Sequence, residues 1–347
     1  MFLQRSEATK AFHLVRESTR DNVATVLWAT GTFEGQPKNV RIPVDSVTKR
    51  ITFAFSVDTK GNELKLIQPS GGAITEGTAG AEAEVTELNC GRIITVSSPQ
   101  AGAWRAEITG TGRYWLRAQA QSDIFLVSAE FVKEGGRPGH EGLFRIQGQP
   151  VTGSQAVLQV NLFASATETS EFYLVTEEGQ PIQKLQMHAV NSDRQALEFV
   201  GSIDLPTVPF RVAVKGSDLN GKPYQRFFSN LFHAESVEVS PRLDFDELSP
   251  GSSKQLAFTV QNLAIPRTFR ITVTDAHQFV AKVEPTELAL GAGESGTVRV
   301  DLIVPVGTAP GVGDNVVFVA SSVVGPATSN SSIVHFSVSS ATTQNPR

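Results

Sequence analysis

Apolar residues follow two different periods along the chain, and the change falls near residue 22. Within residues 5–17, Ala8, Phe12 and Val15 fall at positions i, i+4 and i+7, which is the spacing of one helix face. The basic residues of this segment can then face water, namely Arg5, Lys10 and Arg16. Beyond this point the period shortens to two, as it does in strands. The pattern predicts one short N-terminal helix followed by strands.

The segment at residues 97–120 is either a binding site or part of a sheet, because it holds two of the three tryptophans. Trp104, Ala106 and Ile108 alternate with polar residues, and a Thr-Gly-Thr-Gly turn leads to the next strand. Large aromatic residues at alternate positions usually fill a sandwich core. No cluster of acids, histidines or nucleophiles accompanies them. We therefore expect a β-hairpin with Trp104 pointing inward.

Glycine, proline and charged residues divide the strands into three sets. The segment at 133–142 marks one boundary, and Asn220 and Gly221 mark a tight turn within the second set. We predict an all-β fold of tandem antiparallel β-sandwiches, immunoglobulin-like or jelly-roll-like, with a short N-terminal helix. The predicted parts are a connector helix at 1–20, a first sandwich at 21–134, an immunoglobulin-like second sandwich at 137–235, an immunoglobulin-like third sandwich at 236–339 and a disordered tail at 340–347.

Composition narrows the classes of partner. The net charge is −5 and no basic patch is present, so we expect no nucleic-acid partner. No run of about 18 apolar residues occurs, so we expect no membrane insertion. Cys90 is the single cysteine, which rules out an intramolecular disulfide and a cysteine zinc site. Whether Cys90 is buried or available for intermolecular pairing stays open.

Few residues have the sequence spacing that a catalytic site or a metal site requires. The six histidines do not pair at ligand spacing, and Gly293–Gly296 lies between strands rather than at the strand-to-helix turn of a nucleophile elbow. Asp218–Gly221 is either a hairpin turn or the start of a calcium loop, and the later EF-hand ligands are missing. We predict no catalytic, cofactor-binding or metal-binding residues. Asn330 begins an N-glycosylation triplet and is the one candidate modification site.

Four motifs give the chain a resemblance to a known family. They are Pro43–Asp45 at a strand end, Pro69–Gly71 in a turn, Pro99–Trp104 at a strand start and Pro209–Gly221 in a hairpin. In this order and spacing, residues 20–235 resemble the region that follows the von Willebrand factor A domain in hemicentins and in von Willebrand factor A domain-containing protein 7. Residues 236–340 look similar to generic immunoglobulin-like appendage domains.

The resemblance implies a secreted, extracellular protein whose metal-dependent adhesion site lies in a preceding A domain. This sequence has no Asp-x-Ser-x-Ser motif, so no metal ligand is carried over. The first residues lack a basic region followed by an unbroken apolar run, so they are not a signal peptide. Either the protein is cytosolic or the chain is an internal piece of a longer one, in which case Met1 is not the natural start.

We therefore predict a non-catalytic extracellular module array with a structural or adhesive role. Its expected partners are proteins of the extracellular matrix or the cell surface, and no cofactor is expected. The first alternative is a carbohydrate-binding or spacer region of a secreted enzyme, with Trp28, Trp104 and Trp115 forming a flat stacking platform. The second alternative is an enzyme in its own right, for which the sequence assembles no acid, base or nucleophile.

Overall fold

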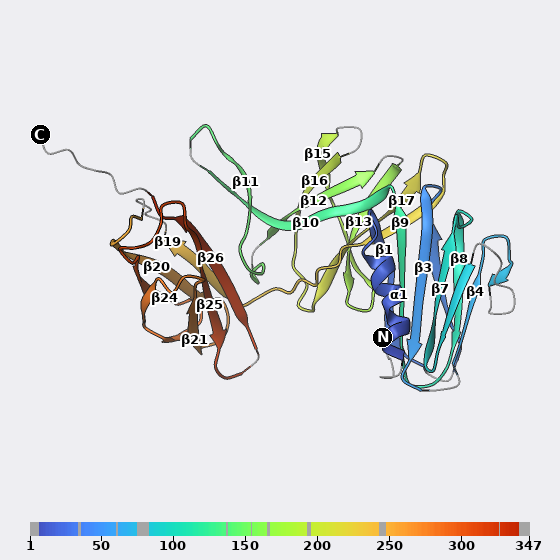
Figure 1. The fold of residues 1–347 in the computed structure, drawn as a ribbon, viewed down its shortest axis with the longest axis horizontal. Helices are drawn as coiled ribbons and strands as arrows, with labels where there is room; N and C mark the ends of the chain where they lie inside the picture. The colour runs from blue at the N-terminus through green and yellow to red at the C-terminus, as the bar shows by residue number, and fades with distance from the viewer. Residues whose placement is uncertain are drawn as a thin grey trace, which may run out of the picture. The chain divides into compact units, whose positions relative to one another are not determined.

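The chain folds mainly into strands, preceded by one helix, α1 (Ala8–Ser18) (Figure 1). The predicted all-β fold of tandem antiparallel sandwiches with a short N-terminal helix is confirmed. Within the described ranges, no helix has the length and apolar character needed to cross a membrane. The predicted disordered tail at 340–347 lies outside the described residues. The computed structural model describes residues 7–33, 36–59, 62–74, 83–136, 138–153, 155–164, 167–192, 196–242, 248–325 and 327–339.

The strands group into two compact units. Unit 1 comprises residues 1–132 and 157–232, and unit 2 comprises residues 133–156 and 233–347. Most of the first two sandwiches predicted from the sequence thus falls in one unit. The division of the chain into three separate sandwiches stays a prediction.

A nine-stranded antiparallel sheet runs through unit 1. Its strands, in spatial order, are β14 (Pro181–Leu185), β13 (Thr167–Thr176), β17 (Phe210–Asp218), β18 (Pro223–Phe227), β1 (Val23–Thr32), β9 (Arg113–Ser122), β3 (Thr48–Val57), β7 (Gly91–Ser97) and β6 (Ala83–Leu88). β1 pairs with β18, where Thr25 lies opposite Phe227. This pairing joins strands that are far apart in the chain into one hydrogen-bonded sheet.

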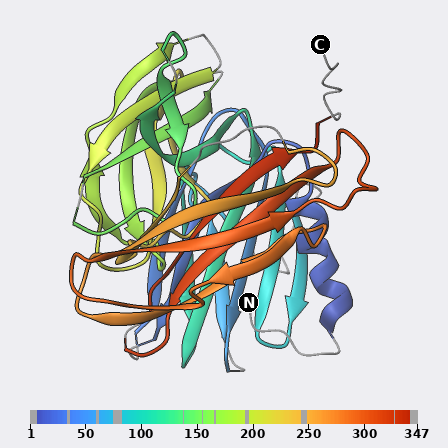
Figure 2. The ribbon, with the colours of Figure 1, turned by 90° about the vertical axis from the view of Figure 1, so that its left-hand side faces the viewer.

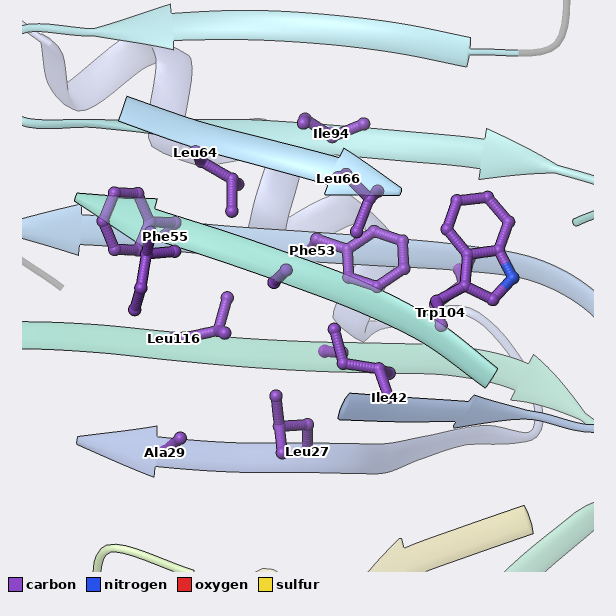
Figure 3. Packing of buried hydrophobic residues seen from close by; sticks show 14 of the residues in the cluster. Leu27, Ala29, Ile42, Phe53, Phe55, Leu64, Leu66, Ile94, Trp104 and Leu116 are labelled. Carbon is purple, nitrogen blue, oxygen red and sulfur yellow. The ribbon is translucent and has the colours of Figure 1, made fainter. Parts of the chain in front are cut away.

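A four-stranded sheet faces part of the nine-stranded sheet and closes a sandwich. Its strands, in order, are β2 (Lys38–Val44), β8 (Gly102–Thr109), β4 (Glu63–Ile67) and β5 (Ala73–Ile74). Apolar side chains from both sheets, among them Phe53 and Trp104, point toward one another in the space between the sheets (Figure 3). Trp104 has no exposed surface and its ring lies 5.7 Å from that of Phe53. The expectation that Trp104 points inward is confirmed.

The hairpin predicted around the Thr-Gly-Thr-Gly turn is wrong in its pairing. β8 pairs with β2 and β4, whereas β9 pairs with β1 and β3, so the two strands lie in opposite sheets. The turn crosses between the layers, and Gly112 has φ +79°, a conformation that favours glycine. The alternation places Trp104 of β8 and Leu116 of β9 in the same core, but a period of two does not specify which strands pair.

The remaining sheet of unit 1 packs aromatic rings against the nine-stranded sheet. Phe131 and Phe199 meet Phe210 and Phe172 at ring-centroid distances of 6.2 and 4.7 Å, respectively. β10 continues into unit 2, where β11 (Gly142–Arg145) is its neighbour. The strands of this sheet in unit 1, in order, are β10 (Ile124–Gly135), β12 (Ala156–Ala164), β16 (Ala196–Ile203) and β15 (His188–Ser192).

Unit 2 contains a sandwich of two four-stranded antiparallel sheets, drawn from orange to red in Figure 2. The first sheet has the order β19 (Val237–Arg242), β20 (Ser253–Asn262), β24 (Ser295–Ile303) and β22 (Val280–Glu284). The second has the order β23 (Glu287–Leu290), β21 (Arg267–Thr274), β25 (Gly313–Ser322) and β26 (Ser329–Ser337). Phe258 and Phe318 are fully buried and stack at 4.3 Å in the core of this sandwich.

The helix α1 docks on unit 1 through polar side chains rather than through the apolar stripe that its period indicates. Phe12 of that stripe is 69% exposed. Glu17 is buried instead and accepts a 2.7 Å hydrogen bond from Nε of Arg50, and Nε2 of His13 lies 2.9 Å from Oγ1 of Thr95. The sheet face beneath the helix is polar, so it pairs with the polar side of the helix.

Candidate functional site

A fully buried ion pair lies in the interior of unit 1. Nη2 of Arg226 donates to Oδ2 of Asp45 at 2.5 Å, and neither side chain has exposed surface. Nη2 also donates to Oγ of Ser122, and Nε donates to the carbonyl of Ile124. Nη1 donates to the carbonyl of Gln225. Removing two charges from water is costly unless they are paired and hydrogen-bonded. Each nitrogen of the guanidinium has an acceptor here, so the pair meets that condition.

Asp218 extends this polar interior through its contact with Ser46, the residue after Asp45. Its Oδ2 accepts hydrogen bonds from the backbone N–H and the hydroxyl of Ser46, at 2.7 and 2.6 Å. Its Oδ1 accepts from the N–H groups of Asn220 and Lys222. Burial alone raises the pKa of Asp218, but these hydrogen bonds outweigh it and set the pKa below its ordinary value.

These contacts favour a hairpin turn over a calcium loop at Asp218–Gly221. Both carboxylate oxygens of Asp218 accept hydrogen bonds from protein donors. β17 and β18 pair directly across the turn, and Gly221 has φ +68°. Aspartate at the start of such a turn commonly accepts hydrogen bonds from the N–H groups that follow it. The sequence therefore encodes a turn that is fastened to the loop after β2.

Two of the motifs behind the family resemblance thus meet within unit 1. Their meeting point is a set of polar contacts that we call the buried joint, formed by Asp45, Ser122 and Arg226 together with Ser46 and Asp218. Asp45 ends the first motif and Asp218 lies in the last one, and the partly buried contact between Ser46 and Asp218 brings the two segments together, next to the buried pair of Asp45 and Arg226. The motifs did not identify Arg226 or Ser122, which complete the joint. No local pattern identified Arg226, because it alternates with aromatic residues in the stretch YQRFF, where an arginine is expected to face solvent.

The three tryptophans do not form a flat platform. Trp104 is buried in the sandwich core, and its Nε1 donates to the carbonyl of Gln100 at 2.7 Å. Trp28 and Trp115 meet edge to face, with an angle of 81° between their rings. A sugar ring stacks on a single open face, and this arrangement presents no shared plane. The platform that the carbohydrate-binding alternative requires is not assembled from these three residues.

Asn330, the predicted glycosylation acceptor, lies in the interior of unit 2. It is 5% exposed, and its Nδ2 donates to the carbonyls of Gln149 and Val237, each at 3.0 Å. Its Oδ1 accepts from the N–H groups of Gln149 and Ser331. A glycan on Nδ2 would displace one of these hydrogen bonds. Glycosylation of Asn330 stays an untested prediction, and these contacts weigh against it.

The remaining residues that the sequence analysis considered do not come together in one site. Cys90 is a free cysteine of intermediate exposure. Gly293–Gly296 spans the end of the turn before β24 and the first two residues of that strand, and Glu294 accepts a hydrogen bond from the N–H of Gly291. Nε2 of His233 lies 2.8 Å from Oε1 of Glu235, whose Oε2 accepts hydrogen bonds from the hydroxyl of Thr328 and the N–H of Ser329. In the part of the chain that the structure describes, no group of three or more histidine, cysteine, aspartate or glutamate residues is placed to hold a metal ion.

Comparison with known families assigns two parts of the chain. Residues 24–123 match the model of the hemicentin galactose-binding domain-like family. Residues 240–340 match the model of the VWA7 Ig-like domain. The first match lies within unit 1 and the second within unit 2.

One curated protein is also similar to the chain over much of its length. The chain is 26% identical over 292 residues to von Willebrand factor A domain-containing protein 7 of Rattus norvegicus, an alignment that covers 77% of this chain and 31% of that protein. The chain therefore spans about a third of the length of the relative that it matches.

Solved structures are only weakly similar to the chain. Bacillus licheniformis lipase BlEst2 in propeptide form has 11% identity and a TM-score of 0.29, over 61% of this chain and 43% of that chain. The ectodomain of mouse nectin-like molecule 4 has 10% identity and a TM-score of 0.20, over 85% of this chain and 96% of that chain. TM-scores this low carry no argument about the fold or the function of the chain.

The predicted resemblance is confirmed by the two family models and the curated relative. Neither model is of an A domain, in agreement with the missing Asp-x-Ser-x-Ser motif. The chain therefore resembles a region of von Willebrand factor A domain-containing proteins that lies outside the A domain, with a segment similar to the hemicentin galactose-binding domain-like family and a segment similar to the VWA7 Ig-like domain.

Proposed function

We propose that the chain is a non-catalytic extracellular module with a structural or adhesive role, acting through protein partners in the matrix or at the cell surface. The matches to a hemicentin domain and to an immunoglobulin-like domain support this role. β-Sandwiches are rigid and present their loops as contact surfaces without needing a reactive cleft. The module would hold its surfaces at fixed positions for a partner.

The observation that carries the proposal is the buried joint of unit 1. Asp45 and Arg226 come from segments 181 residues apart and are linked in the interior, beside the pairing of β1 with β18. A joint of this kind fixes the strands of residues 23–122 relative to those of 167–227. Rigidity across a long sheet suits a spacer or an adhesion surface, because binding then costs little ordering entropy.

The second candidate is the carbohydrate-binding or spacer region of a secreted enzyme. The family model that matches residues 24–123 is described as galactose-binding domain-like, and this description favours the second candidate. The edge-to-face arrangement of Trp28 and Trp115 and the burial of Trp104 weigh against stacking of a sugar on these residues. A glycan array distinguishes the two candidates.

The test uses the full folded chain, immobilised, in parallel with heat-unfolded chain as the control. We expect the folded chain to retain cells or purified matrix proteins in a saturable manner and the unfolded chain to retain neither. We also expect no saturable binding to the neutral, unsulfated glycans of the array. Saturable glycan binding without protein or cell binding would favour the second candidate, and no binding in either assay would contradict the adhesive role.

A further inference from the structure

Two arginines share one tryptophan on the outer face of the nine-stranded sheet. The guanidinium carbon of Arg211 lies 4.6 Å from the ring centroid of Trp28, and that of Arg117 lies 5.1 Å from it. Trp28 lies between Leu27 and Ala29, which belong to the sandwich core, so its side chain points to the opposite face. We call Trp28, Arg117 and Arg211 the tryptophan–arginine cluster.

The sequence neighbours of both arginines place them on the same outer face. Arg117 lies between Leu116 and Ala118, which are fully buried in the core. Arg211 lies between Phe210 and Val212, which are also fully buried. Arg117 comes from β9, directly opposite Trp28, and Arg211 comes from β17, on the other side of β1. Three distant segments therefore converge on one indole ring.

The cluster holds hydrogen-bond donors that lack acceptors. Nε1 of Trp28, Nε of Arg117 and Nε of Arg211 are buried and have no hydrogen-bond partner in the described residues. The partners that these arginines do have are neutral: Nη2 of Arg117 donates to Oγ1 of Thr25, and Nη1 of Arg211 donates to the carbonyl of Ser229. Buried donors without acceptors are rare in folded proteins, and a bound ion is one of the explanations for them.

The two guanidinium groups also lack an ion-pair partner in the part of the chain that the structure describes. Arg211 is only 6% exposed. Burial lowers the pKa of both arginines, and repulsion between Arg117 and Arg211 lowers that of Arg117 further. The charge of Glu177, an exposed residue beyond β13, offsets this effect in part for Arg211. Contact with the indole face stabilises a cation but accepts no hydrogen bond from the Nε–H groups.

We propose that the tryptophan–arginine cluster binds an oxyanion group, a sulfate or a carboxylate, between Arg117 and Arg211. Guanidinium groups match the geometry of such groups and form charge-assisted hydrogen bonds with them. The anion would neutralise the repulsion and accept from the unpartnered donors. Arg117 and Trp115 are partly exposed, which gives the anion a route of approach, and rotation of the Arg117 side chain brings its donors to the ligand.

The test follows the indole N–H resonance of Trp28 in the full chain by NMR while sodium sulfate or sodium acetate is added. Sodium chloride at equal ionic strength is the control for screening. We expect a saturable shift with sulfate or acetate and no saturable shift with chloride. Equal responses to all three salts, or the absence of saturation, would overturn the proposal.

Three variants test whether the anion binds at the tryptophan–arginine cluster. The control variant shows whether a substitution of an exposed arginine alone changes the affinity. Arg117→Gln should weaken binding about tenfold, the effect of losing a hydrogen bond to a charged group. Arg105→Gln is the matched control, because Arg105 is an exposed arginine of unit 1 that pairs with Glu107 at 3.0 Å. The affinity of this variant for sulfate should equal that of the unchanged protein. Arg117→Lys keeps the charge and loses the planar fork, and it should also weaken binding. Equal affinity in all three variants would contradict the assignment.

A heparin-derived oligosaccharide identifies the source of the oxyanion. Competition between this oligosaccharide and sulfate for the Trp28 resonance would support the site and identify sulfated polysaccharide as a ligand. Saturable sulfate binding without such competition would support the site for small anions.

Discussion

Arg226 and Asp45 form an ion pair in which neither side chain has exposed surface, although 181 residues separate them in the chain. The pair connects the loop after β2 with β18 and lies beside the hydrogen bonds that fasten Asp218 to Ser46. Removing one partner leaves the other as an uncompensated buried charge, which is more costly than losing the attraction itself. The stability of unit 1 should therefore depend strongly on this pair.

Arg226→Met tests that dependence. We expect the free energy of unfolding of unit 1 to fall by about 3–5 kcal/mol, measured by chemical denaturation. Arg105→Met is the matched control, since Arg105 is 54% exposed and its ion pair with Glu107 should contribute at most about 1 kcal/mol. Equal losses in the two variants would show that Arg226 is not buried with its partner.

Trp104→Ala probes the sandwich core. Trp104 has no exposed surface, so we expect a loss of about 3–5 kcal/mol in the free energy of unfolding, from lost burial and the cavity left behind. Leu219→Ala, at a position that is 66% exposed, should change it by no more than about 0.5 kcal/mol. A loss below about 1 kcal/mol for Trp104→Ala would place the ring at the surface and revive the binding interpretation.

The pH dependence of stability should reveal Asp218. Its folded-state pKa lies below its ordinary value, so its contribution is fully present above the unfolded-state pKa and is lost as the pH falls through the folded-state pKa. At neutral pH, Asp218→Asn should cost about 1.5–3 kcal/mol. The difference between the two proteins should shrink below about pH 4, measured by urea denaturation across the pH range. A difference that is constant with pH would contradict this assignment.

The docking of α1 gives a fourth prediction. Phe12→Ser should change the free energy of unfolding by less than about 0.5 kcal/mol, because Phe12 is 69% exposed. Glu17→Gln should weaken the contacts with Arg20 and Arg50, and amide exchange in α1 should then become faster. Faster exchange in Phe12→Ser than in Glu17→Gln would mean that the helix docks by its apolar stripe.

Local sequence patterns predicted much of the fold, because the alternation of apolar and polar residues in a strand and the residue preferences of a turn both act over a few residues. The inward position of Trp104 and the turn at Asp218–Gly221 both follow from such patterns. The pairing of β8 and β9 with other strands does not, since neighbours in sequence can lie in opposite sheets. The orientation of α1 was missed for a related reason. The polar face beneath it, which includes Thr95 and Arg50, is set by strands remote in sequence.

The candidate site was harder to predict than the fold. The motif ending at Asp45 was visible in the sequence, but its partner Arg226 lies in an ordinary strand pattern. The convergence of Arg117 and Arg211 on Trp28 depends on the order β17–β18–β1–β9. Strand order arises from long-range pairing, which the periodicity of a single sequence does not encode.

Hydrogen exchange in increasing guanidinium tests most directly the claim that the buried joint makes unit 1 one rigid body. Peptides from β3, in the part before residue 122, and from β17, in the part after residue 157, are the two reporters. We predict that both lose protection at the same denaturant concentration, and that Arg226→Met shifts both together. Loss of protection in one reporter well before the other, with Arg226→Met affecting only one of them, would contradict the account.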